Sequence, residues 1–309
     1  MTLSLPAEFG LIGRYFAPLA GPEGLGLQDD AALFTPPAGR ELVITKDAMV
    51  AGVHFIGDEP ADLIARKLLR SNLSDLAAMG ATPLHYLLAL AVSRGTDEAW
   101  FAAFAKGLAQ DQAHFNITLL GGDTVSTTGP LCVSATLIGH VTPGHALRRT
   151  GACVGDGLYV TGTIGDAALG LRALRGDIID ADGYLVSRYR LPQPRLGLAL
   201  HGIAHAAMDI SDGLLQDLGH LCRASALGAR IDAALVPVSI PGQIETCLTG
   251  GDDYELLLAV PPARHVDLQK ACAGLRITKI GEFVAGERIT VCDIEGAPMT
   301  FSRAGWSHF

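Results

Sequence analysis

The sequence predicts an α/β (α+β) protein of two domains. Apolar runs typical of strands alternate with amphipathic helical segments along the chain, as in sheets covered by helices. The length of 309 residues and a hydrophobic content of 49% are sufficient for two cores. The Gly-rich segment 142–157 (TPGHALRRTGACVGDG) interrupts the alternation, so we expect the domain boundary there. The predicted domains are residues 1–147 and 148–309.

The first domain opens with a strand and a long helix. Residues 41–45 (ELVIT) form a short strand that leads to Asp47. The helix has an acidic cap, Pro60 in its first turn and Gly80 at its end. Its apolar stripe consists of Leu63, Ile64, Leu68, Leu73, Leu76 and Ala77. Because Asn72 and Asp75 are three residues apart on this helix, we expect them to share a face.

The remaining elements follow from the same patterns. Residues 84–92 are predicted to form a buried strand, and Thr96 or Asp97 is expected to cap a second helix. Residues 117–120 (ITLL) run into Gly121-Gly122-Asp123-Thr124. Further strands are expected at 132–141, 158–161, 207–210 and 229–233, with helices opening near Gly165-Asp166 and at Ser211-Asp212-Gly213. The segment CLTGGDDYELLLAV repeats the order of apolar run, Gly-Gly-Asp and apolar run, which suggests a faint internal duplication.

The bulk composition excludes several classes of partner. A net charge of −9 argues against nucleic acid and against an anionic membrane surface. The longest apolar run, residues 87–92, is too short to span a bilayer, and the N-terminus lacks the pattern of a signal peptide. The six cysteines have no CxxC spacing, so we expect reduced thiols, no zinc site and a cytoplasmic protein.

Carboxylates in short Gly-, Ser- or Thr-rich segments are the main functional signal. They are Asp29, Asp30, Asp47, Asp75, Asp123, Asp209, Asp212, Asp252, Asp253 and Glu255. If the fold gathered them into one cleft, their charge would require cations. Hard ions such as Mg²⁺ take oxygen ligands and often bridge to phosphates. The pattern therefore favours metal-dependent phosphate chemistry.

The sequence lacks the GxxxxGK[ST] loop and the HRD and DFG motifs of familiar phosphotransferases. The paired glycines 121–122 and 250–251 would let backbone approach a ligand closely. Ser211 and Asp212 stand at a helix start, either as a simple N-cap or where outward-facing N–H groups bind phosphate. Arg148 and Arg149 are either a phosphate clamp or a solvated loop pair.

Four aromatic or imidazole residues are further candidates for the site. His54 alternates with apolar neighbours, as a half-buried strand residue does. His201 and His205 could share a helix face, but HGIAH lacks the glutamate of HExxH, so no metal role is expected. Trp306 is either a packing anchor or a platform on which a cationic ring stacks.

Taken in order along almost the whole chain, these motifs resemble the thiamine-monophosphate kinases. The resemblance rests on GLQDDAALF, TKDAMVAGVHF, NLSDLAAMGATP, LLGGDT, ALRRTGA, GDGLYVTGTIGD, MDISDGLLQDLGHL, GARID, LTGGDDYEL and GWSHF. It implies transfer of the ATP γ-phosphoryl group to thiamine monophosphate, giving thiamine diphosphate and ADP. It also implies the aminoimidazole ribonucleotide synthetase-like fold. In that fold the N-terminal domain forms a homodimer interface, and the C-terminal domain completes the ATP and substrate site.

The resemblance also implies roles for individual residues. The positions that match Mg²⁺ ligands, for several ions, are Asp30, Thr45, Asp47, Asp75, Asp123, Asp209 and Asp212. Those that match ATP contacts are Gly122, Arg149 and Ser211. Those that match contacts to the thiamine phosphate are His54, Asp252 and Trp306. No side chain is assigned as a general acid or base, because the nucleophile is already an anionic phosphate.

The chain departs from the family pattern at Gln28, Lys46 and Asp252, where Gly, a small hydroxyl residue and Glu are usual. An ammonium at Lys46 would replace or repel one cation. Two alternatives therefore stay open: another ATP-using enzyme of the superfamily, such as aminoimidazole ribonucleotide synthetase or selenophosphate synthetase, and a disabled nucleotide- or thiamine-phosphate-binding protein. Absence of a Cys before Cys132 argues against the selenophosphate synthetases.

Overall fold

The computed structural model describes residues 7–306, so the Ser-His-Phe end of the GWSHF motif lies outside the described residues. The chain divides into two compact units. The N-terminal unit extends to Leu76 and includes Thr82–Pro143, and the C-terminal unit comprises Ala77–Ala81 with the chain from Gly144 onward. The main division therefore falls at 143/144, within the Gly-rich segment. The structure has the mixed α/β composition that the sequence predicts.

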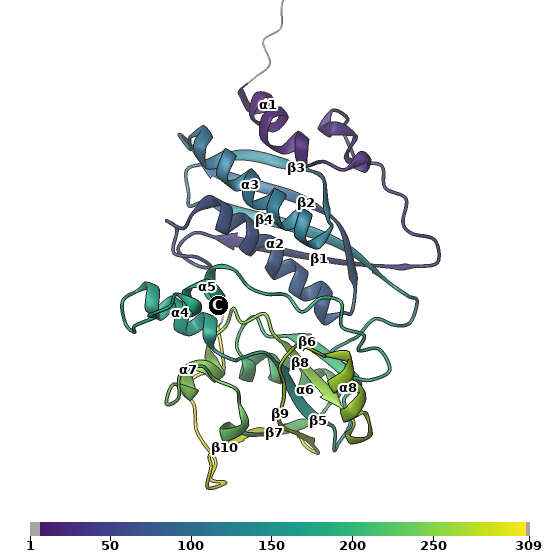
Figure 1. Ribbon diagram of the computed structural model, residues 1–309, viewed down its shortest axis with the longest axis vertical. Helices are drawn as coiled ribbons and strands as arrows, with labels where there is room; N and C mark the ends of the chain where they lie inside the picture. The colour runs from purple at the N-terminus through teal and green to yellow at the C-terminus, as the bar shows by residue number, and fades with distance from the viewer. Residues whose placement is uncertain (1–6, 307–309) are drawn as a thin grey trace, which may run out of the picture. The chain divides into compact units, whose positions relative to one another are not determined.

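The N-terminal unit contains one four-stranded sheet in the order β1-β4-β2-β3. Its strands are β1 Glu41–Val50, β2 Thr82–Ser93, β3 Thr118–Thr127 and β4 Cys132–Val141. Helices α2 (Ala61–Ala78) and α3 (Glu98–Phe115) lie across the same face of this sheet (Figure 1). Before β1 come the short helical turns α1 Ala7–Leu11, η1 Ile12–Phe16, η2 Ala17–Leu19 and η3 Pro22–Leu27.

The two helices predicted for this unit are confirmed as α2 and α3. Their sequence signals, an apolar stripe and an N-cap residue, act within the helix or directly before it. The α2 stripe is fully buried at Leu68, Leu73 and Leu76. Helix α3 has Asp97 as its N-cap, and the Asp97 carboxylate accepts the backbone N–H of Trp100 at 2.8 Å. The predicted strand at 41–45 is too short, since β1 continues to Val50 through ladder pairs with β4.

The opposite face of the N-terminal sheet is partly apolar and exposed. Side chains alternate between the two faces of a strand, so every second residue of β1 lies on this outer face. Leu42 and Ile44 of β1, Leu87 of β2 and Val125 of β3 are 38%, 62%, 39% and 49% exposed, respectively. The N-terminal sheet therefore has one face covered by helices and one face that carries exposed apolar side chains.

The C-terminal unit contains a six-stranded sheet in the order β10-β7-β9-β5-β8-β6. The strands are β5 Gly157–Thr161, β6 Ala206–Asp209, β7 Gly228–Asp232, β8 Leu256–Val260, β9 Ile277–Val284 and β10 Ile289–Cys292. The helices are α4 Asp166–Leu174, α5 Tyr184–Arg190, α6 Leu214–Ser225, α7 Ile244–Thr249 and α8 His265–Ala271, with the 3₁₀ turns η4 Ala233–Leu235 and η5 Pro262–Arg264. Figure 1 shows this arrangement.

Both faces of strands β5, β8 and β6 are buried. Leu158 and Leu257 pack in one core with Leu218 of α6, whereas Tyr159 and Leu258 pack in another with residues of α8. Continuous apolar runs such as LLLAV are typical of strands covered on both sides. The suggested duplication has no structural counterpart here, because the first Gly-Gly-Asp lies within β3 and the second lies in the loop before β8.

Candidate active site

The first acidic cluster joins β1 to α2 in the N-terminal unit. The Thr45 hydroxyl donates a short hydrogen bond to the Asp75 carboxylate. The backbone N–H of Asp47 donates to Asn72 Oδ1 at 3.0 Å. Asn72 and Asp75 therefore share the helix face toward β1, which confirms the prediction from their spacing.

Asn72 holds this arrangement in place. Its side chain is fully buried, and its amide N–H donates to the Leu68 carbonyl at 2.9 Å while its oxygen accepts from Asp47. An unpaired amide at this depth would cost free energy, so both hydrogen bonds fix the distance between helix and strand. Thr45, Asp47 and Asp75 therefore offer a set of oxygen atoms, at fixed positions, that could act as metal ligands.

Asp123 lies on the opposite face of the same sheet from Asp47. The cross-strand row of Asp47 contains Ala135, Leu88 and Gly122, whereas the row of Asp123 contains Ala89, Ser134 and Ala48. Adjacent rows point to opposite faces. Within the N-terminal unit, the expected single group of carboxylates is therefore divided between the two faces of the sheet.

Lys46 lies on the outer face with Asp123. Its ammonium donates to Ser134 Oγ at 2.7 Å, and the Ser134 hydroxyl donates to the Asp47 carbonyl at 2.8 Å. Ser134 is in the same cross-strand row as Asp123. The departure at Lys46 therefore adds one positive charge to the face that carries the Asp123 carboxylate.

In the Gly121-Gly122 pair of β3, one glycine is required by the packing of β3 against β2, which the sequence alone did not indicate. A Cβ at Gly122 would stand 1.9 Å from the Leu88 carbonyl oxygen of β2. A Cβ at Gly121 would have Leu87 Cδ2 as its nearest neighbour, at 3.7 Å. Only the second glycine is thus required by the close approach of two strands. In the other pair, a Cβ at Gly251 would meet the Ser211 carbonyl at 2.4 Å.

The remaining predicted positions of this unit are at its surface or near the end of β1. Asp30 lies in an exposed segment after η3. His54 lies in the turn after β1, where its Nδ1 accepts the backbone N–H of Val50 at 3.0 Å. A neutral His54 ring therefore carries its proton on Nε2.

The second acidic cluster lies at the end of β6 in the C-terminal unit. Asp209 is the last residue of β6 and is 3% exposed. Ser211 and Asp212 follow in the loop that leads into α6. The backbone N–H groups of Ser211, Asp212 and Gly213 all donate to Asp217 Oδ2, at 3.0, 3.0 and 3.1 Å. One carboxylate inside α6 thus organises the whole loop.

This geometry corrects both interpretations of the Ser-Asp pair. The N-cap of α6 is Gly213, without a side-chain cap, so neither Ser211 nor Asp212 is a simple N-cap. The N–H groups expected to face a phosphate are instead bound to Asp217. Burial raises the pKa of the Asp217 carboxyl to about 7, the Asp212 carboxylate adds to the rise, and the backbone donors oppose it.

Asp217 was not among the predicted site residues, although its position in the first turn of α6 is a usable signal. An acidic residue in the first turn of a helix can accept N–H groups from the preceding loop. Gln216 was missed as well. Its amide N–H groups donate to Asp212 Oδ2 at 3.3 Å and to the Trp306 carbonyl at 2.5 Å.

Two segments distant in sequence contact this loop. Asp252, which has a left-handed backbone (φ 69), donates its N–H to the Ser211 carbonyl at 2.7 Å. Its carboxylate accepts the Tyr254 hydroxyl at 3.2 Å. The Trp306 N–H donates to the Asp212 carbonyl at 3.1 Å, and Trp306 is 46% exposed. The structure therefore brings Ser211, Asp212, Asp252 and Trp306 together.

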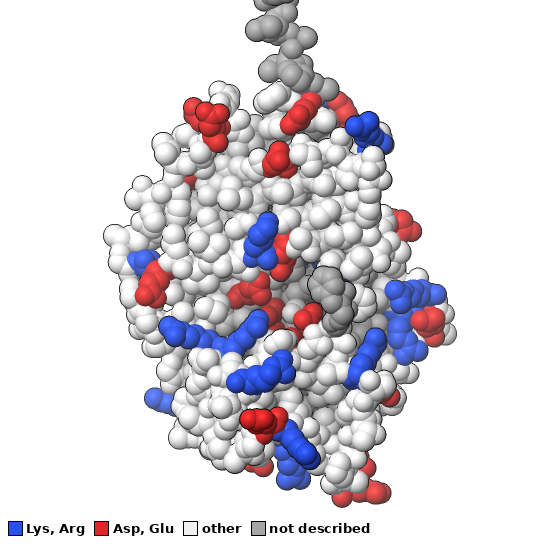
Figure 2. Space-filling model, turned by 180° about the vertical axis from the view of Figure 1, so that it is seen from behind, with Lys and Arg blue, Asp and Glu red and all other residues white. Residues whose placement is uncertain are grey.

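Arg149 lies in the same unit with its backbone fixed. Its carbonyl accepts the Ser225 hydroxyl at 3.1 Å, and the adjacent Arg148 carbonyl accepts the Ala207 N–H at 2.8 Å. The pKa of His220 on α6 is lowered by burial, and the charges of Arg223 and Arg149 add to this. The Arg149 backbone is therefore tied to the last residue of α6. Figure 2 shows acidic and basic side chains beside one another on the face it presents.

A helix long and apolar enough to cross a membrane does not occur among residues 7–306.

Comparison with known proteins covers nearly the whole chain. Residues 28–141 match the AIR synthase related protein N-terminal domain, and residues 154–293 match the corresponding C-terminal domain. The thiamine-monophosphate kinase of Caulobacter vibrioides is 48% identical over 98% of this chain and 91% of its own length. That of Escherichia coli (strain K12) is 43% identical over 98% of both chains.

Solved structures agree with the sequence comparison. A thiamine-monophosphate kinase from Stenotrophomonas maltophilia K279a has a TM-score of 0.80 at 38% identity, covering 88% of this chain and 91% of that one. AaThiL complexed with AMPPCP and TMP has a TM-score of 0.78 at 27% identity and covers 100% of both chains. With two matched domains and relatives of this identity over almost its full length, the chain belongs to the thiamine-monophosphate kinase family within the AIR synthase related proteins.

Proposed function

We propose that the protein transfers the γ-phosphoryl group of ATP to thiamine monophosphate and releases thiamine diphosphate and ADP. The observation that carries this proposal is the convergence of Ser211, Asp252 and Trp306 on one loop of the C-terminal unit. These residues match ATP and substrate contacts of the family, and they come from three separate segments. The AaThiL structure, which covers 100% of both chains, is complexed with AMPPCP and TMP. It therefore supports ATP and thiamine monophosphate as the two ligands.

Each unit contributes its own groups in this proposal. The N-terminal unit supplies the dimer surface, the metal-side residues Asp47 and Asp75, and the ATP-side residue Gly122. The C-terminal unit supplies Arg149 and Ser211 for ATP, and Asp252 and Trp306 for the thiamine phosphate. His54, in the N-terminal unit, supplies an imidazole donor to that substrate through the Nε2 proton that the Val50 hydrogen bond specifies.

The donor set fits Mg²⁺. Both acidic clusters offer carboxylate and hydroxyl oxygens, which are the ligands that hard divalent cations take. Burial raises the pKa of the Asp217 carboxyl to about 7, and the neighbouring Asp212 carboxylate adds to the rise. We propose that Thr45, Asp47, Asp75, Asp209 and Asp212 hold the ions, with Asp30 and Asp123 as further ligands. Bound Mg²⁺ would neutralise phosphate charge and orient the phosphates for in-line transfer.

The chemical step is a direct displacement. A phosphate oxygen of thiamine monophosphate attacks the γ-phosphorus, the bond from the γ-phosphorus to the β–γ bridging oxygen breaks, and ADP leaves with that oxygen. The attacking group is already an anion, so no side chain has to remove a proton. The residues of this chain position two anions in line and keep water away from the transferred group.

We also propose that the protein is a homodimer in the cytoplasm. The outer face of the N-terminal sheet carries the exposed apolar residues Leu42, Ile44, Leu87 and Val125, and a second copy of this face would bury them. The six cysteines are all free thiols, which suits a reducing compartment.

The experiment that tests the function compares two acceptors. Purified protein is incubated with ATP and Mg²⁺ and either thiamine monophosphate or thiamine, and ADP and thiamine products are quantified together. The proposal requires one ADP for each thiamine diphosphate, and no thiamine monophosphate formed from thiamine. Tight binding of both ligands without ADP release would instead indicate the disabled binder. Absence of both binding and turnover would indicate another reaction of the superfamily.

A further inference from the structure

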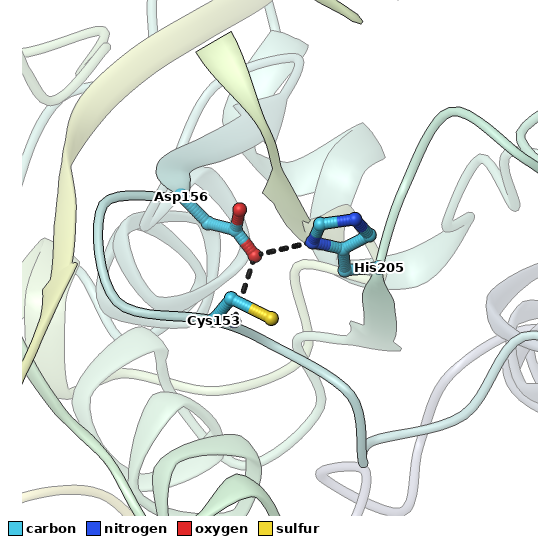
Figure 3. Close-up of side chains that lie close together, drawn as sticks. All are labelled: Cys153, Asp156 and His205. Atoms are coloured by element: carbon cyan, nitrogen blue, oxygen red, sulfur yellow. Dashed lines mark hydrogen bonds and ion pairs between the residues drawn. The ribbon is translucent and has the colours of Figure 1, made fainter. Parts of the chain in front are cut away.

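Three potential metal ligands lie together in the C-terminal unit, separate from the residues assigned to phosphoryl transfer. Cys153 Sγ, an Asp156 carboxylate oxygen and a His205 ring nitrogen all lie within 4.8 Å of one another. Figure 3 shows the three side chains converging from two segments, with dashed lines from one Asp156 oxygen to Cys153 and to His205. The proposed kinase reaction uses none of these side chains.

Strand pairing in the sheet places the two segments at the same end of neighbouring strands. Strands β5 and β6 both pair antiparallel with β8, on its two sides. Gly157 of β5 pairs with Val260, and Ala206 of β6 pairs with Ala259. Asp156 and His205 are the residues immediately before these two strands, so they lie at the same end of β8. The pair is therefore positioned by backbone ladders and not by flexible side chains alone.

Asp156 is fixed and the other two ligands are accessible. The Asp156 carboxyl is 4% exposed, and its Oδ2 accepts the Cys153 backbone N–H at 2.8 Å. The same oxygen lies 2.8 Å from His205 Nδ1. The Asp156 backbone is held by Phe283, whose N–H donates to the Asp156 carbonyl at 2.9 Å. The His205 side chain is 42% exposed and Cys153 is exposed, so an ion could enter from solvent.

The ligand types select the metal. One thiolate, one imidazole and one carboxylate form a borderline-soft set that suits Zn²⁺, whereas Mg²⁺ takes oxygen ligands. We propose that Cys153, Asp156 and His205 form a Zn²⁺ site in which water occupies the fourth position. On binding, the Cys153 thiol loses its proton. The ion takes the place of the proton between His205 Nδ1 and Asp156, and the neutral, metal-bound ring carries its single proton on Nε2.

The occupied site would link the segment after Arg149 to the start of β6. Residues 151–156 come shortly after Arg148 and Arg149. The Arg148 carbonyl accepts a hydrogen bond from the Ala207 N–H, and the Arg149 carbonyl accepts one from the Ser225 hydroxyl. A metal bridge from Cys153 to His205 adds a second tie between this segment and β6. Because a ligand that binds only the folded state stabilises it, Zn²⁺ should raise the unfolding temperature of the protein.

Cobalt substitution tests the site without reference to kinase activity. Co²⁺ is added to the full-length protein in the presence of excess Mg²⁺, which occupies the oxygen-ligand sites. The expected result is one Co²⁺ per chain with thiolate-to-metal charge-transfer absorption in the near ultraviolet, abolished by Cys153→Ser and by His205→Gln. The matched controls, Cys132→Ser and His201→Gln, should retain the band. Added Zn²⁺ should displace Co²⁺ and remove the band.

The contrary outcomes are equally specific. Absence of the band in the wild type, or its retention in Cys153→Ser or His205→Gln, would overturn the site. Thermal unfolding of each variant confirms that the fold is intact. As a second readout, Zn²⁺ should slow alkylation of Cys153, measured by mass spectrometry, at least about 10-fold relative to Cys132, because a metal-bound thiolate is withheld from the reagent. Equal alkylation rates with and without Zn²⁺ would also contradict the proposal.

Discussion

The Lys46 ammonium donates a hydrogen bond to Ser134 Oγ at 2.7 Å, on the outer face of the N-terminal sheet. Because Ser134 shares a cross-strand row with Asp123, the ammonium and the Asp123 carboxylate belong to the same face. We expect Lys46→Thr to lower the half-saturating Mg²⁺ concentration about 5-fold, since a unit charge a few ångströms away is worth about 1 kcal/mol when the groups are fully solvated. The Mg²⁺ dependence of the initial rate measures this. Lys106→Thr, which removes an exposed charge from α3, is the control, and superimposable titrations of wild type and Lys46→Thr would refute the idea.

Asp75→Asn should remove most of the activity and leave the fold intact. The Asp75 carboxylate accepts from Thr45 and is only half-buried, so an amide of the same shape can replace it. Loss of one charged metal-side ligand is expected to lower kcat at least about 100-fold. Asp62→Asn, near the start of the same helix, is the control. Wild-type turnover in Asp75→Asn would show that the β1–α2 cluster does not hold a catalytic ion.

Gly122→Ala and Gly121→Ala should behave differently although the residues are adjacent. A Cβ at position 122 would overlap the Leu88 carbonyl at 1.9 Å, whereas at position 121 it would make ordinary contact at 3.7 Å. Gly122→Ala has to separate β2 from β3 and should lower the free energy of unfolding by about 2 kcal/mol or more. Urea unfolding measures both variants. Equal stability of the two would mean that the strands are not in this close register.

Trp306→Ala should weaken binding of thiamine monophosphate selectively. The Trp306 backbone is tied to Asp212 and Gln216, so its half-exposed ring is held beside the loop. A cationic ring stacked on indole gains about 1–2 kcal/mol, so the KM for thiamine monophosphate should rise roughly 10-fold. The KM for ATP should stay constant. Ile294→Ala, at a side chain 86% exposed, is the control, and an equal rise in both KM values would indicate a packing role.

Glu255→Ala should strongly destabilise the C-terminal unit. The fully buried Glu255 carboxylate accepts from Arg188 Nη2 at 2.9 Å, from Arg195 Nε at 2.6 Å and from the Thr161 hydroxyl at 2.6 Å. Its removal leaves the Arg188 charge buried without this partner, which costs about 3–5 kcal/mol. Urea unfolding checks this against Glu282→Ala, an exposed position on β9. A loss below about 1 kcal/mol would contradict the assigned role.

Local features of the fold and site could be predicted from the sequence. Helix α2 has an apolar stripe, Pro60 directly before its first residue and Gly80 shortly after its last, and these signals act within a few residues. The shared face of Asn72 and Asp75 follows from helical spacing alone. The end-to-end order of short motifs indicated the family, which the comparisons confirm.

Features set by strand pairing could not be predicted in this way. The separation of Asp47 and Asp123 onto two faces depends on the order β1-β4-β2-β3, which is determined by contacts between distant segments. The role of Asp217 depends on a loop that folds back onto its own helix. The proximity of Cys153 and His205 depends on the pairing of β5 and β6 with the two sides of β8, and no spacing in the sequence indicates it.

The most direct test of the central claim is formation of thiamine diphosphate by the purified protein. ATP, thiamine monophosphate and MgCl₂ are mixed with the protein, and the thiamine phosphates are separated by chromatography over time, with a parallel reaction in which EDTA removes the metal. The proposed mechanism predicts thiamine diphosphate that accumulates in proportion to the protein added and is abolished by EDTA. Absence of thiamine diphosphate with Mg²⁺, or equal formation in EDTA, would contradict the proposed metal-dependent phosphoryl transfer.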